Sequence, residues 1–115
     1  MDIETIREYC LSKPRATEDL PFGNETLVFK VCDKIFLLVG LTNPQSFNVK
    51  CDPERAAQLR EEFSEVKPGY HMNKKHWNTV SFKGVLTKKQ LQEMIDHSYE
   101  LVLKSLPKAK QQSLS

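Results

Sequence analysis

The stretch that decides the fold is residues 27–39, which read LVFKVCDKIFLLV. In its first half Leu27, Phe29 and Val31 share one parity, and a second run of β-branched and aromatic residues follows Asp33-Lys34. Such runs are typical of strands, in which successive side chains point to opposite faces of a sheet. Because only a short polar break separates them, the two runs predict a pair of strands joined by a tight turn.

A third strand and a helix are predicted directly after this pair. Phe47, Val49 and Cys51 alternate with polar residues, which indicates a strand with one face in water. The following Asp52-Pro53-Glu54 is typical of a helix start, because aspartate accepts from the free amides of the first turn. Proline there presets the helical dihedral, and glutamate suits the positive end of the helix dipole.

The remaining segments predict two more helices and two more strands. Ile3, Ile6 and Cys10 have the spacing of one helical face, and extended segments are expected around residues 70–72 and 76–83. A capping box at Thr87 predicts the start of the longest helix, which Pro107 ends.

The predicted order is α-β-β-β-α-β-β-α, and short turns between strands favour an antiparallel sheet. Helices with one apolar stripe each cover only one face of it, so the fold class is α+β, a two-layer sandwich with an antiparallel sheet backed by helices. One domain is assigned to residues 1–106, and residues 107–115 are expected to be a polar, flexible tail.

Composition narrows the class of protein without naming a function. The chain has 115 residues, of which 39% are hydrophobic and 28% charged, with a mean hydropathy of −0.50. These values argue against a membrane protein and a disordered one. The three cysteines form no C-x-x-C pair, and the acidic amino terminus lacks the basic region of a signal peptide, so a cytoplasmic location is expected.

The net charge of +2 hides an uneven distribution. Residues 1–65 hold 8 Lys or Arg and 12 Asp or Glu, whereas residues 66–115 hold 9 and 3. No acidic residue lies between Glu65 and Glu93, a stretch that contains Lys67, Lys74, Lys75, Lys83, Lys88 and Lys89. This basic stretch is suited to a polyanion, although lysines that only line solvated turns would give the same pattern.

Residues 70–78 form the densest chemical cluster of the chain, with two lysines, two histidines, two asparagines, a tyrosine and the only tryptophan. Lysines pair with phosphates, asparagines contact backbone or base edges, and aromatic rings stack on bases. Nucleic-acid contacts are therefore predicted for His71, Asn73, Lys74, Lys75, His76, Trp77 and Asn78, with Lys67, Lys83, Lys30 and Lys50 adding positive charge around them. Strand parity places Trp77 on the uncovered sheet face, but a bulge that turns it inward would make it a core anchor instead.

Enzyme and metal signatures are weak. The four glycines are too dispersed for a phosphate-binding loop, and no G-x-S-x-G motif is present. His71 and His76 have no neighbouring third ligand for a metal. We therefore expect no catalytic residues, no metal and no cofactor.

Several motifs together carry a resemblance. These are Pro21-Phe22-Gly23, Lys50-Cys51-Asp52-Pro53-Glu54, Leu59-Arg60, Ser98-Tyr99 and, most specific, the run from Pro68-Gly69 through Tyr70-His71-Met72-Asn73-Lys74-Lys75-His76-Trp77-Asn78 to Thr79-Val80. With them the sequence resembles the MmcQ/YjbR family over about residues 1–106. The resemblance implies a small bacterial cytoplasmic protein with helices behind an antiparallel sheet, and DNA binding through a pair of wing-like hairpins.

Two functions from different classes follow. The first is binding of duplex DNA by backbone electrostatics, with Lys74 and Lys75 at a hairpin tip. The alternative is a protein- or peptide-binding adaptor or chaperone-like module that uses the open sheet face, with Trp77 and Tyr70 as anchors. An enzyme acting on a small anionic ligand ranks third. The sequence does not indicate the oligomeric state, and no membrane partner is expected.

Overall fold

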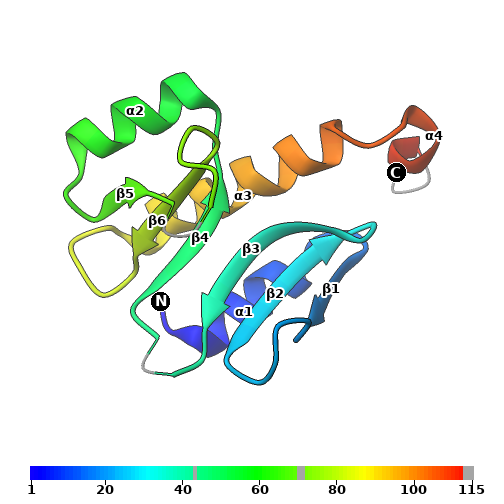
Figure 1. Ribbon diagram of the computed structural model, residues 1–115, viewed down its shortest axis with the longest axis horizontal. Coiled ribbons are helices and arrows are strands. Elements are labelled where there is room, and N and C mark those ends of the chain that lie inside the picture. Colours follow the sequence, from blue (N-terminus) through cyan, green and yellow to red (C-terminus); the bar gives the residue numbers. More distant parts are fainter. Residues whose placement is uncertain (43, 70–71, 113–115) are drawn as a thin grey trace.

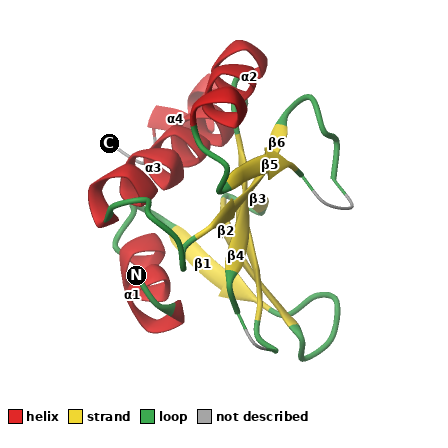
Figure 2. Ribbon diagram, turned by 90° about the vertical axis from the view of Figure 1, so that its left-hand side faces the viewer, coloured by secondary structure: helices red, strands yellow, loops and turns green. Residues whose placement is uncertain are grey.

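The computed structural model describes residues 1–42, 44–69 and 72–112. Its strands form one six-stranded antiparallel sheet in the order β1-β2-β3-β4-β6-β5 (Figure 1). The helices lie on one face of this sheet and leave the other face open (Figure 2). Along the chain the elements are α1 (Ile3–Leu11), β1 (Ala16–Asp19), β2 (Thr26–Val31), β3 (Lys34–Gly40), β4 (Ser46–Lys50), α2 (Pro53–Glu62), β5 (Val66–Pro68), β6 (Trp77–Ser81), α3 (Lys88–Lys104) and α4 (Lys108–Gln112).

The predicted fold class is confirmed, and so is the central hairpin. Val31 pairs with Lys34, which leaves Cys32 and Asp33 as a two-residue loop. Both have positive φ angles, 48° and 66°, the conformation of the turn whose twist matches a hairpin. A bulge at Phe29/Lys30 then places neighbouring Phe36 and Leu37 in the same core.

The helices begin and pack as their sequence patterns predict. Asp52 caps α2 by accepting from the Arg55 amide, and Thr87 caps α3 by accepting from the Gln90 amide. The predicted face of α3 is buried against the sheet, and it comprises Leu91, Ile95, Ser98 and Val102. No helix in the described part of the chain is long and apolar enough to cross a bilayer.

Three elements differ from the expectation. Strand β1 was not predicted, because its sequence Ala-Thr-Glu-Asp has no apolar alternation and pairs at the sheet edge through its backbone. The fourth strand was expected around residues 70–72, but β5 lies earlier, at Val66–Pro68, and Tyr70 and His71 are outside the described residues. The tail expected to be flexible contains the short helix α4, in which the Gln111 side chain donates to the Leu106 carbonyl.

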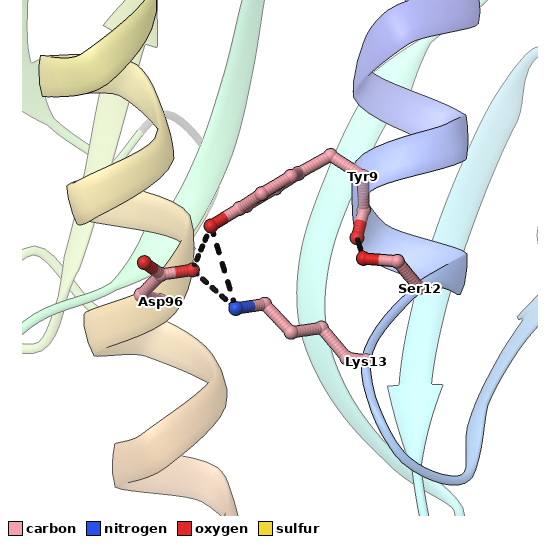
Figure 3. Close-up of polar contacts among 4 residues, drawn as sticks. All are labelled: Tyr9, Ser12, Lys13 and Asp96. Atoms are coloured by element: carbon pink, nitrogen blue, oxygen red, sulfur yellow. Dashed lines mark hydrogen bonds and ion pairs between the residues drawn. The ribbon is translucent and has the colours of Figure 1, made fainter.

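A polar cluster fastens α1 to α3 (Figure 3). The Tyr9 hydroxyl donates to Asp96 Oδ1 at 2.5 Å, and Lys13 Nζ forms an ion pair with the same oxygen. Burial and this hydrogen bond raise the pKa of Tyr9. The Lys13 ammonium also lies 4.7 Å from the centroid of the Tyr9 ring, so the cation is held from two sides.

Ser98 closes a gap between the two central strands. The regular pairing of β3 with β4 reaches Leu37 and Val49, and one step further the strands are joined through a side chain instead. Ser98 Oγ donates to the Phe36 carbonyl at 2.6 Å and accepts from the Lys50 amide at 2.8 Å. Because Ser98 is fully buried, no solvent would replace these bonds.

The three consecutive amides that leave β4 are all bound. The Lys50 amide donates to Ser98, the Cys51 amide to the His76 carbonyl at 2.7 Å, and the Asp52 amide to His97 Nε2 at 3.2 Å. This β4–α2 junction, residues 50–52, is therefore tied to α3 on one side and to the residue before β6 on the other.

Replacing Ser98 with alanine is expected to lower the free energy of unfolding by about 1–3 kcal/mol, because two buried backbone groups lose their partner. Ser105→Ala is the control, since Ser105 is exposed at the end of α3, and its loss should be about 0.5 kcal/mol or less. Urea unfolding measures both. Equal losses for the two variants would contradict the role assigned to Ser98.

Stability should fall as the pH decreases below about 6.5. Burial, followed by the charge of Arg55, lowers the pKa of His97 below its usual 6.5. As the pH falls, His97 is therefore protonated in the unfolded chain before it is protonated in the folded chain. The contribution of His97 to stability is complete above about pH 6.5 and is lost as the pH falls below the unfolded pKa and towards the lower pKa of the folded chain.

Urea unfolding between about pH 7.5 and 5 measures this dependence. His97→Gln keeps an acceptor for the Asp52 amide without a titrating group, and its stability should depend less on pH. Gln58→Ala, at an exposed position of α2, is the control and should keep the wild-type dependence. An unchanged pH dependence in His97→Gln would contradict the assignment.

Candidate functional site

The predicted cluster lies in the hairpin of β5 and β6, whose connecting loop spans residues 69–76. Lys67 pairs with Thr79 and Pro68 with Asn78, so the loop begins and ends at the same end of the sheet. The described part of this loop projects on the side away from the helices (Figure 2). Its residues Tyr70 and His71 lie outside the described part of the chain, so the predicted role of His71 stays a prediction.

Asn73 organises the described part of this loop. Its Oδ1 accepts from the Lys75 amide at 3.0 Å, and its carbonyl accepts from the amides of His76 at 3.2 Å and Trp77 at 3.0 Å. These contacts make a compact turn that presents Lys74 and Lys75 at its surface, where both are exposed. Asn73 thus shapes the turn.

Gly69 allows the loop to close. Its amide donates to the Trp77 carbonyl at 2.8 Å. A Cβ at this position would lie 2.8 Å from the Trp77 Cβ and 3.0 Å from the Trp77 carbonyl oxygen, closer than side chains approach. Only glycine fits without a shift of the backbone.

Arg60 of α2 holds the loop from behind. Its Nε donates to Asn78 Oδ1 at 2.8 Å, and its Nη2 donates to the Trp77 carbonyl at 3.1 Å and to the Lys74 carbonyl. A planar guanidinium serves these three acceptors at once. The sequence reasoning did not single out Arg60, because two of its partners are backbone carbonyls; its only signal was its place in the Leu59-Arg60 motif of the resemblance.

Asn78 lies beneath the surface. It is 1% exposed, and its side chain is occupied by Arg60. The prediction that Asn78 contacts a nucleic acid is therefore corrected: its side chain supports the loop. His76 is half-buried, and its carbonyl receives the Cys51 amide, so the backbone of His76 joins the loop to the β4–α2 junction.

Trp77 lies on the open face of the sheet, as strand parity predicts. It pairs with Lys50 of β4, and it belongs neither to the hydrophobic core nor to the described apolar residues packed against that core. The alternative of Trp77 as a core anchor is therefore wrong. The side chain is partly buried, which leaves part of the indole accessible beside Lys50.

The predicted lysines fall into three groups. Lys67, Lys74, Lys75 and Lys83 are all exposed, and none forms an ion pair with a described residue; we call them the hairpin lysines. Lys30 and Lys50 are partly buried on the open face, and Lys30 is paired with Asp19 at 3.2 Å. Lys88 and Lys89 begin α3, in the helical layer, and Lys88 lines a hollow beside α1.

Cys10 and Cys51 are not poised for nucleophilic chemistry. Burial raises the pKa of Cys10 to about 12 and also raises the pKa of Cys51. Both therefore stay protonated near neutral pH. Among the described residues, no three His, Cys, Asp or Glu side chains are grouped to hold a metal ion.

Comparison with known proteins finds relatives over nearly the whole chain. The family model described as YjbR matches residues 11–101. The uncharacterized protein YjbR of Escherichia coli K12 is 34% identical over 115 residues, covering 99% of this chain and 98% of the relative. The uncharacterized protein YbdF of Escherichia coli O157:H7 is 37% identical over 109 residues, covering 94% and 89% respectively.

Solved structures share the fold. A crystal structure of a Deinococcus radiodurans protein has a TM-score of 0.90 and 39% identity, and the alignment covers 97% of this chain and 86% of that one. A crystal structure of a Pseudomonas syringae protein has a TM-score of 0.76 and 27% identity, with 89% and 99% coverage.

Arg60→Lys should loosen the 69–76 loop, because a lysine keeps the charge but cannot serve Asn78 and two carbonyls together. The free energy of unfolding is expected to fall by about 1–3 kcal/mol, and the amides of Gly69 and Trp77 should exchange hydrogen faster. Arg55→Lys, on the exposed side of α2, is the matched control. Wild-type exchange rates at Gly69 and Trp77 in Arg60→Lys would contradict the clamp.

Proposed function

The chain belongs to the YjbR family, and from the surface described above we propose that it binds duplex DNA through the hairpin lysines. The binding is electrostatic and directed at the phosphate backbone. The E. coli relatives are described as uncharacterized, so the proposal depends on this chain's own surface and on what the family resemblance implies.

The observation that carries the proposal is the position of the hairpin lysines. Lys74 and Lys75 lie in the loop before β6, Lys67 pairs with the middle of β6, and Lys83 follows its end. At about 3.3 Å per strand residue, these positions spread the cations along roughly 15–20 Å of the hairpin. A row of this length can contact several phosphates of one duplex strand.

The surroundings of the hairpin lysines favour a polyanion. None of the exposed ammonium groups forms an ion pair with a described residue, so an incoming phosphate breaks no ion pair there. The backbone of Lys74 and Lys75 is held by Arg60 and Asn73, so little backbone order must be gained at these two residues on binding.

The proposed binding is largely independent of base sequence. Asn78 is buried, and Asn73 uses its Oδ1 within the turn, so few side chains remain to distinguish base edges. Trp77 lies half-buried beside Lys50 and can report on a nearby duplex through its fluorescence, since it is the only tryptophan of the chain.

The double variant Lys74→Glu/Lys75→Glu should weaken binding of a labelled duplex at least about tenfold, because two attractive charges become repulsive. Four phosphate contacts predict a log–log salt slope of roughly −3.5 for the wild type, and losing two of them should reduce this slope by about 2. Fluorescence anisotropy at several salt concentrations measures both quantities.

The matched control is Lys104→Glu/Lys108→Glu, which makes the same change of net charge at exposed positions on α3 and α4. It should bind almost as well as the wild type. No binding at low salt, or equal losses in the two double variants, would overturn the proposal. If a protein partner is retained after nuclease treatment and is lost in Lys74→Glu/Lys75→Glu, the adaptor alternative replaces it.

A further inference from the structure

A polar hollow lies on the open face at the opposite end of β6 from the 69–76 loop. It has a volume of about 510 Å³, and its walls include Ser46, Ser64, Glu65, Lys67, Ser81 and Lys83. Proteins bind small molecules in cavities of roughly 300–1,000 Å³, so this hollow has the size of a small-ligand site.

Three strands and the segments that flank them bring these residues together. Ser46 of β4 pairs with Ser81 of β6, and the Ser81 amide donates to the Glu65 carbonyl at 2.9 Å. Lys67 of β5 lies two residues beyond Glu65, which directly precedes that strand. The floor of the hollow is therefore regular backbone, which holds its side chains in fixed relative positions.

Gly84 brings the segment after β6 against Glu65. A Cβ at Gly84 would lie 2.7 Å from Glu65 Cγ and 2.8 Å from Glu65 Oε2. The absence of a side chain at Gly84 thus lets the chain close one side of the hollow. The Glu65 carboxylate is held in that wall, while Lys67 and Lys83 supply the positive charge.

The lining selects a ligand with both an anionic group and hydroxyl groups. The two ammonium groups and the serine hydroxyls are donors suited to a phosphate. A carboxylate repels phosphate but accepts hydrogen bonds from a sugar diol, as acidic residues do for ribose in dinucleotide-binding proteins. The ammonium groups and Glu65 therefore suit different ends of one molecule.

We propose that this hollow binds a ribonucleoside monophosphate, with the phosphate at Lys67 and Lys83 and the ribose hydroxyls at Glu65. The site goes beyond duplex binding and draws on the proposed function only in sharing these two lysines. The same chemistry is offered by a free nucleotide and by the terminal nucleotide of an RNA strand.

The test is a titration of the ¹⁵N-labelled full chain with adenosine 5′-monophosphate at constant ionic strength, followed by amide chemical shifts. Saturable shifts are expected at Ser46, Glu65, Lys67 and Ser81. Lys67→Gln/Lys83→Gln should weaken binding about tenfold, which corresponds to two exposed charge pairs. Lys104→Gln/Lys108→Gln, the matched control with the same charge change, should bind as the wild type does.

A second variant tests the ribose contact. In Glu65→Gln the preference for adenosine monophosphate over inorganic phosphate should decrease, and so should the preference over the 2′-deoxy nucleotide. If the wild type binds inorganic phosphate as tightly as the nucleotide, or if these amides do not shift, the proposal is overturned.

The same set of variants separates this site from duplex binding. Lys74→Glu/Lys75→Glu should keep nucleotide binding while binding the duplex at least about tenfold more weakly. Failure of nucleotide binding with duplex binding intact overturns only the hollow. Nucleotide binding with no duplex binding supports the hollow and overturns the proposed function. If a short RNA shifts the same amides and binds more tightly than the free nucleotide, the ligand of the hollow is the terminal nucleotide of an RNA strand.

Discussion

Three successive backbone amides, those of Lys50, Cys51 and Asp52, are the point on which the second half of the fold depends. Each has a partner in a different residue, Ser98, His76 and His97 respectively. The bonds set where α2 starts relative to α3 and where the loop before β6 returns to the sheet. Arg60, two turns further along α2, can reach the carbonyls of that loop only because the helix start is placed in this way.

The one-sided helical layer determines which chemistry the open face can carry. The apolar stripes of the helices pack against the covered face of the sheet. The open face is therefore formed by the alternate residues of each strand, whose side chains point away from the helices. Its central pair, Val28 and Leu38, is buried, while Ser46, Asn48 and Lys67 make the half nearer β5 polar. The hairpin lysines and the hollow lie in this half, where hydroxyl and ammonium groups are not competing with core packing.

Sequence reasoning succeeded where a signal is local. The capping residues Asp52 and Thr87, the alternation around Phe47 and the central hairpin all depend on neighbouring residues, and all are confirmed. Sequence reasoning failed where the interaction involves backbone groups that are distant in the sequence. Strand β1 is held by pairing with β2 rather than by apolar side chains, and Arg60 acts on carbonyls 14 and 17 residues away.

Residues 69–78 include some that support the loop and others that face solvent, and the residue types alone do not reveal which are which. Gly69, Asn73 and Asn78 build or support the loop, so part of the apparent nucleic-acid chemistry is structural. Lys74 and Lys75 are the residues that this support presents to solvent.

Ion pairs distinguish the cations that stabilise the fold from the cations that face solvent. The three ion pairs found among the described residues use Arg7, Lys13 and Lys30, all from the acidic first part of the chain. The hairpin lysines have no such partner within the same residues, and in water each exposed cation attracts an anion only weakly. A useful affinity therefore requires several of them to act on one ligand, which a row of cations along one hairpin provides and scattered surface lysines do not.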